Sequence, residues 1–411
     1  MDEIEIPEYF LCPISLEILK DPVTTITGIT YERESIEHWL KTAKSNPTCP
    51  VTKQSLPKDS ELTPNHTLRR LIQSWCTTNA INDVDRIPTP KSPVKKSQIL
   101  RLMKDLDATD HHLSTKALTR MEALAKEDER NRTCMVEAGV AKAMVLFIVR
   151  CFKEEKTTGL EEGLRILYLI WNPSQETFKL LVRENQDFID SLTWILRCEM
   201  HNHVAVKTHA MLVLQKTMEI GCQKLLEGLK VDFFKDIITR VLRKRISKLG
   251  IKSAFHVLTE VCPWGRNRMK IVEANGVFEL IELELEKPEK IITELIFNLL
   301  AQLCSCADGR EQFLKHAGSI AMLSKRVLRV STATDDRALH ILDSISKFSA
   351  RDEAVLEMLR VGAVSKLCMV IQADCAPYLK KKARGILRLH SNLWNNSPCI
   401  AVYLLTRYPG N

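Results

Sequence analysis

Apolar residues recur at helical spacing through most of this chain. Two of the clearest stripes are Leu164, Leu167, Tyr168 and Trp171, and Ile292, Leu295, Ile296, Leu299, Leu300 and Leu303. Their members lie three or four residues apart, which places them on one face of a helix. From about residue 99 to residue 411 the pattern therefore predicts one amphipathic helix after another.

A glycine-containing turn recurs between these predicted helices. It appears as Glu137-Ala-Gly139-Val140, Ala274-Asn-Gly276-Val277, His316-Ala-Gly318-Ser-Ile320 and Arg360-Val-Gly362-Ala363, and three copies have an arginine upstream, at 132, 268 and 310. The glycines are 137, 42 and 44 residues apart, and the first interval fits three periods of about 46 with degraded turns near Asp187 and Lys230. A period of roughly 40–47 residues is typical of an armadillo or HEAT solenoid, in which each helix set buries its apolar face by stacking on its neighbours. An irregular helical bundle is the alternative.

The first 79 residues follow a different pattern. Residues 23–31 are rich in β-branched side chains and contain a glycine, which predicts a short hairpin. Residues 36–40 and 68–75 have helical spacing, and Asn65 is suited to cap the second of these helices. The sequence thus predicts a compact ββα unit closed by another helix.

Three segments follow from these patterns. Residues 80–98 contain several prolines with Ser, Thr and Lys, a composition that predicts a linker. We therefore expect a small domain at 5–79, a linker at 80–98 and a helical repeat array at 99–411.

Composition narrows the class of protein. Hydrophobic residues make up 45% and charged residues 27% of 411, with 14 glycines and 6% aromatics, which favours a mainly α, soluble chain of about two to four units. Residues 1–80 hold 8 Lys/Arg and 11 Asp/Glu, a net charge of −3. Because the whole chain has a net charge of +8, residues 81–411 have a net charge of +11. The 13 cysteines show no regular framework, and the acidic start carries no secretory signal. We expect reduced thiols in a cytoplasmic protein, with the nucleus as the other compartment.

The first segment lacks metal-binding spacing. A zinc-binding RING domain needs eight ligands in paired Cys-x-x-Cys motifs, whereas residues 1–80 contain only Cys12, Cys49, Cys76, His38 and His66 as candidates. Phosphate loops and nucleophile elbows are also missing from the sequence. No metal and no cofactor are expected.

An ordered set of short motifs nevertheless spans this segment. It comprises Phe10-Leu-Cys-Pro-Ile-Ser-Leu-Glu17, Asp21-Pro-Val23, Gly28-Ile-Thr-Tyr-Glu-Arg33, Ile36-Glu-His-Trp39, Cys49-Pro-Val51 and Leu62-Thr-Pro-Asn65. The set resembles the U-box, a RING-shaped domain that replaces zinc with hydrogen bonds and ion pairs. Together with the helical array, the chain resembles plant U-box ubiquitin ligases with C-terminal armadillo repeats. The resemblance implies a mainly α protein: a small, zinc-free α+β U-box followed by an armadillo-type α-solenoid.

The resemblance also implies a set of site residues. In U-boxes the Cys-Pro-Ile-Ser and Cys-Pro-Val loops form a shallow groove for a ubiquitin-conjugating enzyme, and a basic residue after the second loop clamps ubiquitin on its carrier. The corresponding positions here are Ile14, Leu16, Pro50 and Val51 for the groove, Trp39 beside it, Lys53 as the clamp, and Cys12 and Pro13 as loop support. Many ligases have arginine at the clamp, and lysine cannot make the same forked contact. The alternative interpretation of the apolar residues is that they pack in the core. The alternative interpretation of Lys53 is that it is a solvated surface residue without a special role.

Such a ligase needs no covalent nucleophile, because the carrier thioester is already activated. Holding ubiquitin and the acceptor lysine in reactive poses is catalysis by proximity, through a transient interface of under ~1,200 Å². Two alternatives stay open at this point. One is a non-catalytic armadillo-repeat adaptor, and the other is a ligase that forms a thioester on a cysteine.

The resemblance implies partners and a setting as well. They are a ubiquitin-conjugating enzyme, ubiquitin, a protein substrate on the array, a homo- or hetero-oligomer through the U-box, and plant stress or defence signalling. Thr63, Thr89 and Ser92 precede prolines and are candidate phosphorylation sites. Basic clusters at 240–248 and 380–384 predict solvated helix faces or contacts with acidic substrates or anionic lipids, so membrane contact would be peripheral at most. Nucleic acid binding is not expected, because interleaved aromatic residues are missing.

Overall fold

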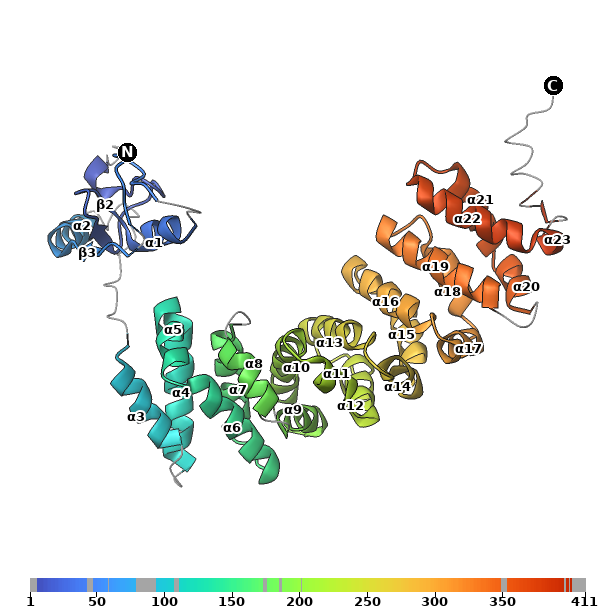
Figure 1. Ribbon diagram of the computed structural model, residues 1–411, viewed down its shortest axis with the longest axis horizontal. Coiled ribbons are helices and arrows are strands. Elements are labelled where there is room, and N and C mark those ends of the chain that lie inside the picture. The colour runs from blue at the N-terminus through green and yellow to red at the C-terminus, as the bar shows by residue number, and fades with distance from the viewer. Residues whose placement is uncertain are drawn as a thin grey trace. The chain divides into compact units, whose positions relative to one another are not determined.

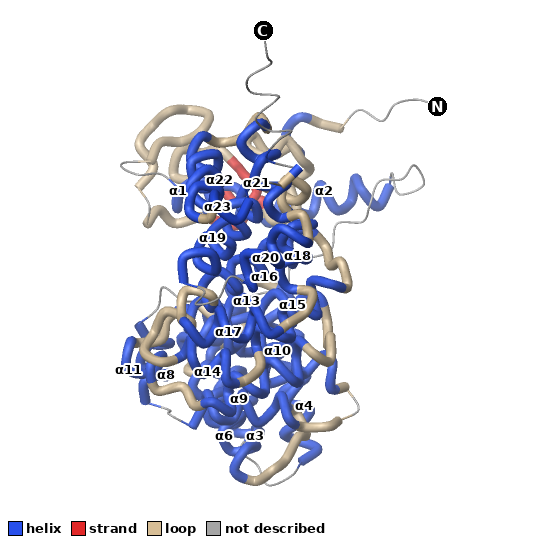
Figure 2. The backbone as a smooth tube through the Cα atoms, turned by 90° about the vertical axis from the view of Figure 1, so that its right-hand side faces the viewer, coloured by secondary structure: helices blue, strands red, loops and turns tan. Residues whose placement is uncertain are grey.

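The computed structural model of the chain divides into two compact units, 1–93 and 94–411. It describes residues 6–42, 47–57, 59–78, 94–106, 111–172, 176–184, 187–200, 202–348 and 353–394, together with 397, 398 and 400. Strands occur only in unit 1 among these residues, whereas unit 2 is helical throughout (Figures 1 and 2).

Unit 1 is a small α+β domain. Its elements are η1 (Glu8–Phe10), β1 (Pro22–Thr24), β2 (Thr30–Glu32), α1 (Arg33–Thr42), β3 (Thr63–Pro64) and α2 (His66–Thr78). The strands form an antiparallel sheet in the order β2-β1-β3, with Val23 opposite Tyr31 on one side and Pro64 on the other. The hairpin is confirmed, and Asn65 caps α2 by accepting a hydrogen bond from the Leu68 backbone N–H at 3.0 Å.

Unit 2 starts within the segment assigned to the linker, since α3 begins at Lys96. Its first half comprises α3 (Lys96–Leu106), α4 (His111–Glu127), α5 (Glu129–Glu137), α6 (Val140–Lys153), α7 (Leu160–Ile170), α8 (Glu176–Glu184), α9 (Asp187–Arg197), α10 (His203–Glu219), α11 (Gln223–Glu227), α12 (Val231–Asp236) and the π-helical turn η3 (Ile237–Leu242). Its second half comprises α13 (Lys248–Val261), α14 (Asn267–Glu273), α15 (Gly276–Leu285), α16 (Lys290–Leu303), α17 (Ala307–Lys315), α18 (Ser319–Arg326), α19 (Thr332–Phe348), α20 (Glu353–Arg360), α21 (Ala363–Gln372), α22 (Pro377–Leu389) and α23 (Ser391–Trp394).

Every third helix of unit 2 stacks on its equivalent in the next repeat. The row runs from α4 through α7, α10, α13, α16 and α19 to α22 (Figure 1). From α7 onward these helices begin at residues 160, 203, 248, 290, 332 and 377, at intervals of 42–45 residues. One continuous apolar core runs through the stack from Ile99 to Trp394. The predicted fold class, mainly α with an armadillo-type solenoid, is confirmed.

The recurring turn has a conformational cause. Gly139 and Gly362 have φ of +88° and +78°, a left-handed conformation that ends the preceding helix and costs glycine little. At the second turn Asn275 takes that conformation with φ +64°, and at the third Gly318 keeps φ at −91°. The two degraded turns also precede helices, because α9 begins at Asp187 and Lys230 immediately precedes α12.

Candidate functional site

Two loops of unit 1 have the same backbone construction. In loop 1 (residues 12–17) the Leu16 N–H donates a hydrogen bond to the carbonyl of residue 12 at 2.8 Å, and the N–H of residue 12 donates one to the carbonyl of residue 17 at 2.8 Å. In loop 2 (residues 49–54) the corresponding distances are 2.9 Å, from the Lys53 N–H, and 2.8 Å. Leu16 and Lys53 both adopt positive φ, +58° and +63°. Non-glycine residues seldom hold that conformation unless their surroundings impose it, and such positions cluster at functional surfaces.

Neighbouring residues of β2 anchor the two loops through sulfur. The Glu32 backbone N–H donates to the Cys12 sulfur of loop 1 at 3.2 Å, and the Tyr31 hydroxyl contacts the Cys49 sulfur of loop 2 at 2.9 Å. Both cysteines are fully buried. Because adjacent residues of one strand hold them, the loops are fixed relative to each other.

Hydrogen bonding changes the acidity of these thiols. Burial raises the pKa of Cys49, but hydrogen bonds from Thr27, Thr52 and Tyr31 outweigh burial and lower it to about 6. Burial also raises the pKa of Cys12, but hydrogen bonds from the backbone N–H groups of Ser15, Glu32 and Ile14 outweigh burial and lower it. The sulfurs thus act as buried acceptors.

Ion pairing ties the sheet to the helices of unit 1. The Asp21 carboxylate pairs with the Arg33 Nε at 2.7 Å and with the Arg69 guanidinium, which lies on α2. The Glu32 carboxylate accepts hydrogen bonds from the backbone N–H groups of Lys20, at 2.6 Å, and Asp21. Across the residues that the structure describes, no three His, Cys, Asp or Glu side chains cluster as a metal site would require.

The predicted contact residues lie on these loops and on α1. Leu16 and Val51 are 75% and 49% exposed, whereas Ile14 and Pro50 are partly buried. The Trp39 ring is 41% exposed, and its Nε1 donates to the Thr48 carbonyl at 2.9 Å, which joins α1 to the start of loop 2. The structure therefore brings Trp39 to loop 2 and leaves apolar side chains of both loops open to solvent.

The positions of the remaining predicted residues do not distinguish a functional role from a structural one. Lys53 and Pro13 are exposed, and Cys12 is buried beneath loop 1. Thr63 is exposed in β3, opposite Thr24. Thr89 and Ser92 lie outside the described residues. The assigned roles of these residues stay predictions.

Known proteins match both units. A family model described as the U-box domain matches residues 6–81, and one described as the plant U-box protein ARM repeat region matches 98–410. E3 ubiquitin-protein ligase PUB23 of Arabidopsis thaliana is 41% identical over 415 residues, covering 99% of this chain and 98% of that protein. PUB24 of the same plant is also 41% identical, over 448 residues, covering 99% and 96%.

The chain belongs to the plant U-box proteins with armadillo repeats. Its unit 1 is the U-box, its unit 2 is the ARM array, and the chain is a RING-type (U-box) E3 ubiquitin transferase. A solved engineered protein has a TM-score of 0.52 at 20% identity, covering 72% of this chain and 68% of its own, which supports the fold alone.

Several residues that hold this U-box together were not singled out from its sequence. One of the motifs that resemble the U-box contains Tyr31, Glu32 and Arg33. Its spacing does not reveal that the first two contact the loops and that the third pairs with Asp21. Arg69 lies 48 residues from Asp21 in sequence, and nothing in the local pattern pairs them. A search for charged residues flanking the hairpin could have suggested the pair.

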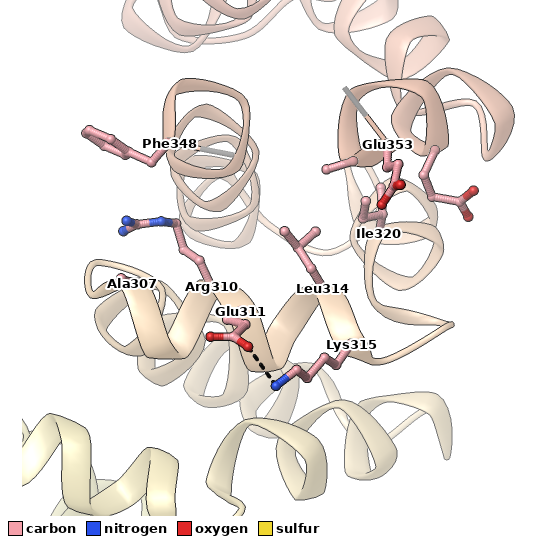
Figure 3. A pocket seen from close by; sticks show the side chains of 10 residues that line it. Ala307, Arg310, Glu311, Leu314, Lys315, Ile320, Phe348 and Glu353 are labelled. Atoms are coloured by element: carbon pink, nitrogen blue, oxygen red, sulfur yellow. Dashed lines mark ion pairs between the residues drawn. The ribbon is translucent and has the colours of Figure 1, made fainter. Parts of the chain in front are cut away.

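The ARM array contains a cavity where sequence reasoning placed no site. It has a volume of about 810 Å³ and is lined by residues of α17, α18 and α20 and by Phe348 at the end of α19 (Figure 3). The Arg310 guanidinium lies 4.7 Å from the Phe348 ring centroid and donates to two carbonyl groups just after α16, at 3.1 and 3.2 Å. The Glu311–Lys315 ion pair borders it at 2.7 Å. The cavity is a preformed concave surface on the array.

Proposed function

We propose that the U-box recruits a ubiquitin-conjugating enzyme through its two loops and α1. The observation that carries this proposal is the exposure of Leu16 and Val51 on loops whose backbones are fixed to β2. Apolar side chains held rigidly in solvent are typical of protein–protein contact surfaces. Ile14, Pro50 and Trp39 would complete the contact.

Transfer would then proceed without a covalent ligase intermediate. Cys12 and Cys49 are fully buried and hydrogen-bonded, which supports a structural role over attack on a thioester. Lys53, exposed directly after the loop 2 turn, would hold ubiquitin against its carrier. The catalytic contribution is the restriction of the thioester to reactive orientations for an incoming lysine.

The ARM array would bind the protein substrate. Its stacked helices present an extended surface, and solenoids commonly use such surfaces for recognition. The similarity to ubiquitin ligases of Arabidopsis supports a plant setting. A role in stress or defence signalling, in the cytoplasm or nucleus, is part of the same proposal. Pairing of U-boxes, and its control by phosphate at Thr63, belong to the same proposal.

Substitution of Leu16 by aspartate tests the recruitment step. Because Leu16 is 75% exposed, L16D should leave the fold intact while placing a charge in the contact. We expect ubiquitin attachment with purified components to fall at least roughly 100-fold, about 3 kcal/mol at a central contact residue. Ile14→Asp should act in the same direction.

Ile26→Asp is the matched control. Ile26 is 63% exposed, lies in the hairpin turn outside both loops and should retain full activity. Unchanged ubiquitin attachment by L16D would remove the proposal, and inactivity of the unmodified protein with a panel of conjugating enzymes would favour the adaptor alternative. Lys53→Arg separately tests the clamp, since a forked donor should raise the rate several-fold.

A further inference from the structure

The two basic clusters of the ARM array differ in how their charges are compensated. The first follows η3 and is paired with carboxylates of both neighbouring repeats. These pairs are Lys244 with Glu199, Arg243 with Glu279, Arg245 with Glu286, and Lys248 with Glu289. This cluster joins consecutive repeats and has little charge left for a partner.

The second cluster, on α22, is almost unpaired. Lys382 pairs with Asp336 of α19 at 2.6 Å. Within the described parts of the chain, Lys380, Lys381, Arg384 and Arg388 have no carboxylate within ion-pair distance. Residues 375–411 contain six Lys/Arg and no Asp or Glu, and the preceding acidic residue, Asp374, makes no ion pair within the described parts of the chain.

These four cations occupy one side of α22. Lys380, Arg384 and Arg388 follow at intervals of four residues, and Lys381 lies beside Arg388 on the same face. The opposite face is buried in the array through Leu379, Ala383 and Ile386. The unpaired charges therefore form a stripe, called here the α22 stripe, that points away from the core.

Apolar groups border the α22 stripe. Tyr378 and Leu389 are each 49% exposed, and the surface at Gly385 is open, with no atom within 4 Å of where a Cβ would stand. α22 packs on α19 and α21, and of the described helices only the short α23 follows it, so the stripe lies at the end of the row (Figure 1).

This chemistry fits a lipid surface better than an acidic protein segment. An acidic peptide is usually bound by guanidinium groups that neighbouring side chains hold in place, whereas the cations of the α22 stripe have no ion-pair partners among the described residues. Unpaired Lys and Arg flanked by an aromatic and a leucine suit an anionic membrane, whose charge is diffuse and whose interface accepts Tyr and Leu. None of the helices in the described part of the chain has the length and hydropathy to cross a bilayer.

We propose that the α22 stripe is a docking surface for anionic phospholipid membranes. Membrane contact would hold the ARM array and its substrate site at a lipid surface, and it does not depend on the proposed recruitment by the U-box. The contact would be reversible and salt-sensitive, because it is largely electrostatic.

Co-sedimentation of the full chain with vesicles tests the proposal. The probes are phosphatidylcholine vesicles and phosphatidylcholine vesicles with 20% phosphatidylserine. We expect at least tenfold tighter binding to the anionic vesicles and release when salt rises from about 0.1 to 0.5 M. The triple variant Lys381→Glu, Arg384→Glu and Arg388→Glu should bind roughly 100-fold more weakly, at about fivefold for each lost cation.

The control triple is Lys224→Glu, Lys325→Glu and Arg329→Glu. It makes the same change in net charge at exposed cations outside α22, and it should keep vesicle binding. A second triple variant guards against misfolding: it carries Lys381→Gln, Arg384→Gln and Arg388→Gln, and its melting temperature should equal that of the unmodified protein. Equal loss in both glutamate triples, or no binding by the unmodified protein, would overturn the proposal. Stoichiometric binding of polyglutamate at a salt concentration that releases the protein from vesicles would point instead to an acidic protein segment and would also overturn it.

Discussion

In the U-box, polar and sulfur-containing side chains position the functional loops, whereas in the ARM array a continuous apolar core joins one repeat to the next. The described U-box core has eleven buried residues, three of them cysteines, and two cysteines anchor the loops. The core of the array runs unbroken from Ile99 to Trp394.

This difference bears on how each region fails. A small domain buries little apolar surface, so a few polar contacts carry a large share of its stability. In an array, stability is spread over repeats and their interfaces, so damage at one position is shared with neighbours. A substitution that removes one of these polar contacts should therefore unfold the U-box, whereas a substitution in the core of the ARM array should loosen only its own and the neighbouring repeats.

Asp21→Ala should have the largest effect. It leaves the Arg33 and Arg69 guanidinium groups without the carboxylate that pairs them, and the Asp21 side chain is only 15% exposed. Removing one partner of such a pair costs about 3–5 kcal/mol, comparable to the whole stability of a small domain. Region-resolved amide hydrogen exchange should show loss of protection throughout the U-box, with the array unchanged.

Asp59→Ala is the control for that substitution, because Asp59 is exposed and has no ion pair among the described residues. If Asp21→Ala exchanged like Asp59→Ala, the U-box would not depend on this ion pair.

Leu300→Ala should be nearly as costly but more local. Leu300 is fully buried in α16, and truncating it leaves a cavity worth about 2–5 kcal/mol. Hydrogen exchange should increase in α16 and its neighbours α13 and α19, while the U-box keeps its protection. Ile291→Ala, at a 52% exposed position of the same helix, should change little. Loss of protection along the whole array would contradict the distributed picture.

Cys49→Ser should have a smaller effect that depends on pH. The pKa of Cys49 is lowered to about 6 in the fold, so the folded U-box binds fewer protons there than the unfolded chain does. The hydrogen-bonded thiolate stabilises the fold fully above the ordinary thiol pKa, and this contribution disappears as pH falls through about 6.

The gap in urea midpoint between the unmodified protein and Cys49→Ser should therefore widen from pH 6 to pH 8.5. Cys222→Ser, at an exposed cysteine of the array, provides the comparison. A gap that is constant with pH would mean that the Cys49 sulfur accepts its hydrogen bonds as a neutral thiol.

Sequence reasoning reached the fold through strongly periodic features. Helical stripes and the glycine turn predict the array, since both follow from backbone geometry and burial. It missed that Asn275 would take the left-handed position one residue before Gly276, because asparagine tolerates that conformation nearly as well.

The site was less accessible to the same reasoning. The two loop motifs identify the candidate residues through a family resemblance, but they do not show that Leu16 and Lys53 share a positive φ. The anchoring of both loops by one strand also depends on contacts between distant parts of the chain, which local patterns do not encode. The unpaired charges of α22 and the paired ones near η3 look alike in sequence, because their difference lies in the neighbouring repeats.

Lys153→Ala should have the smallest effect and sharpens the comparison from the other side. Lys153, at the end of α6, forms an ion pair with Asp187, at the start of α9, at 2.8 Å. Asp21 of the U-box also makes ion pairs. In the Lys153–Asp187 pair, however, the side chains are 62% and 53% exposed, so water and salt screen the pair, and its loss should cost below roughly 1 kcal/mol. Thermal unfolding at low and high salt should show a small deficit that vanishes in high salt. A loss as large as that of Asp21→Ala would mean that ion pairs, and not the apolar core, join the repeats.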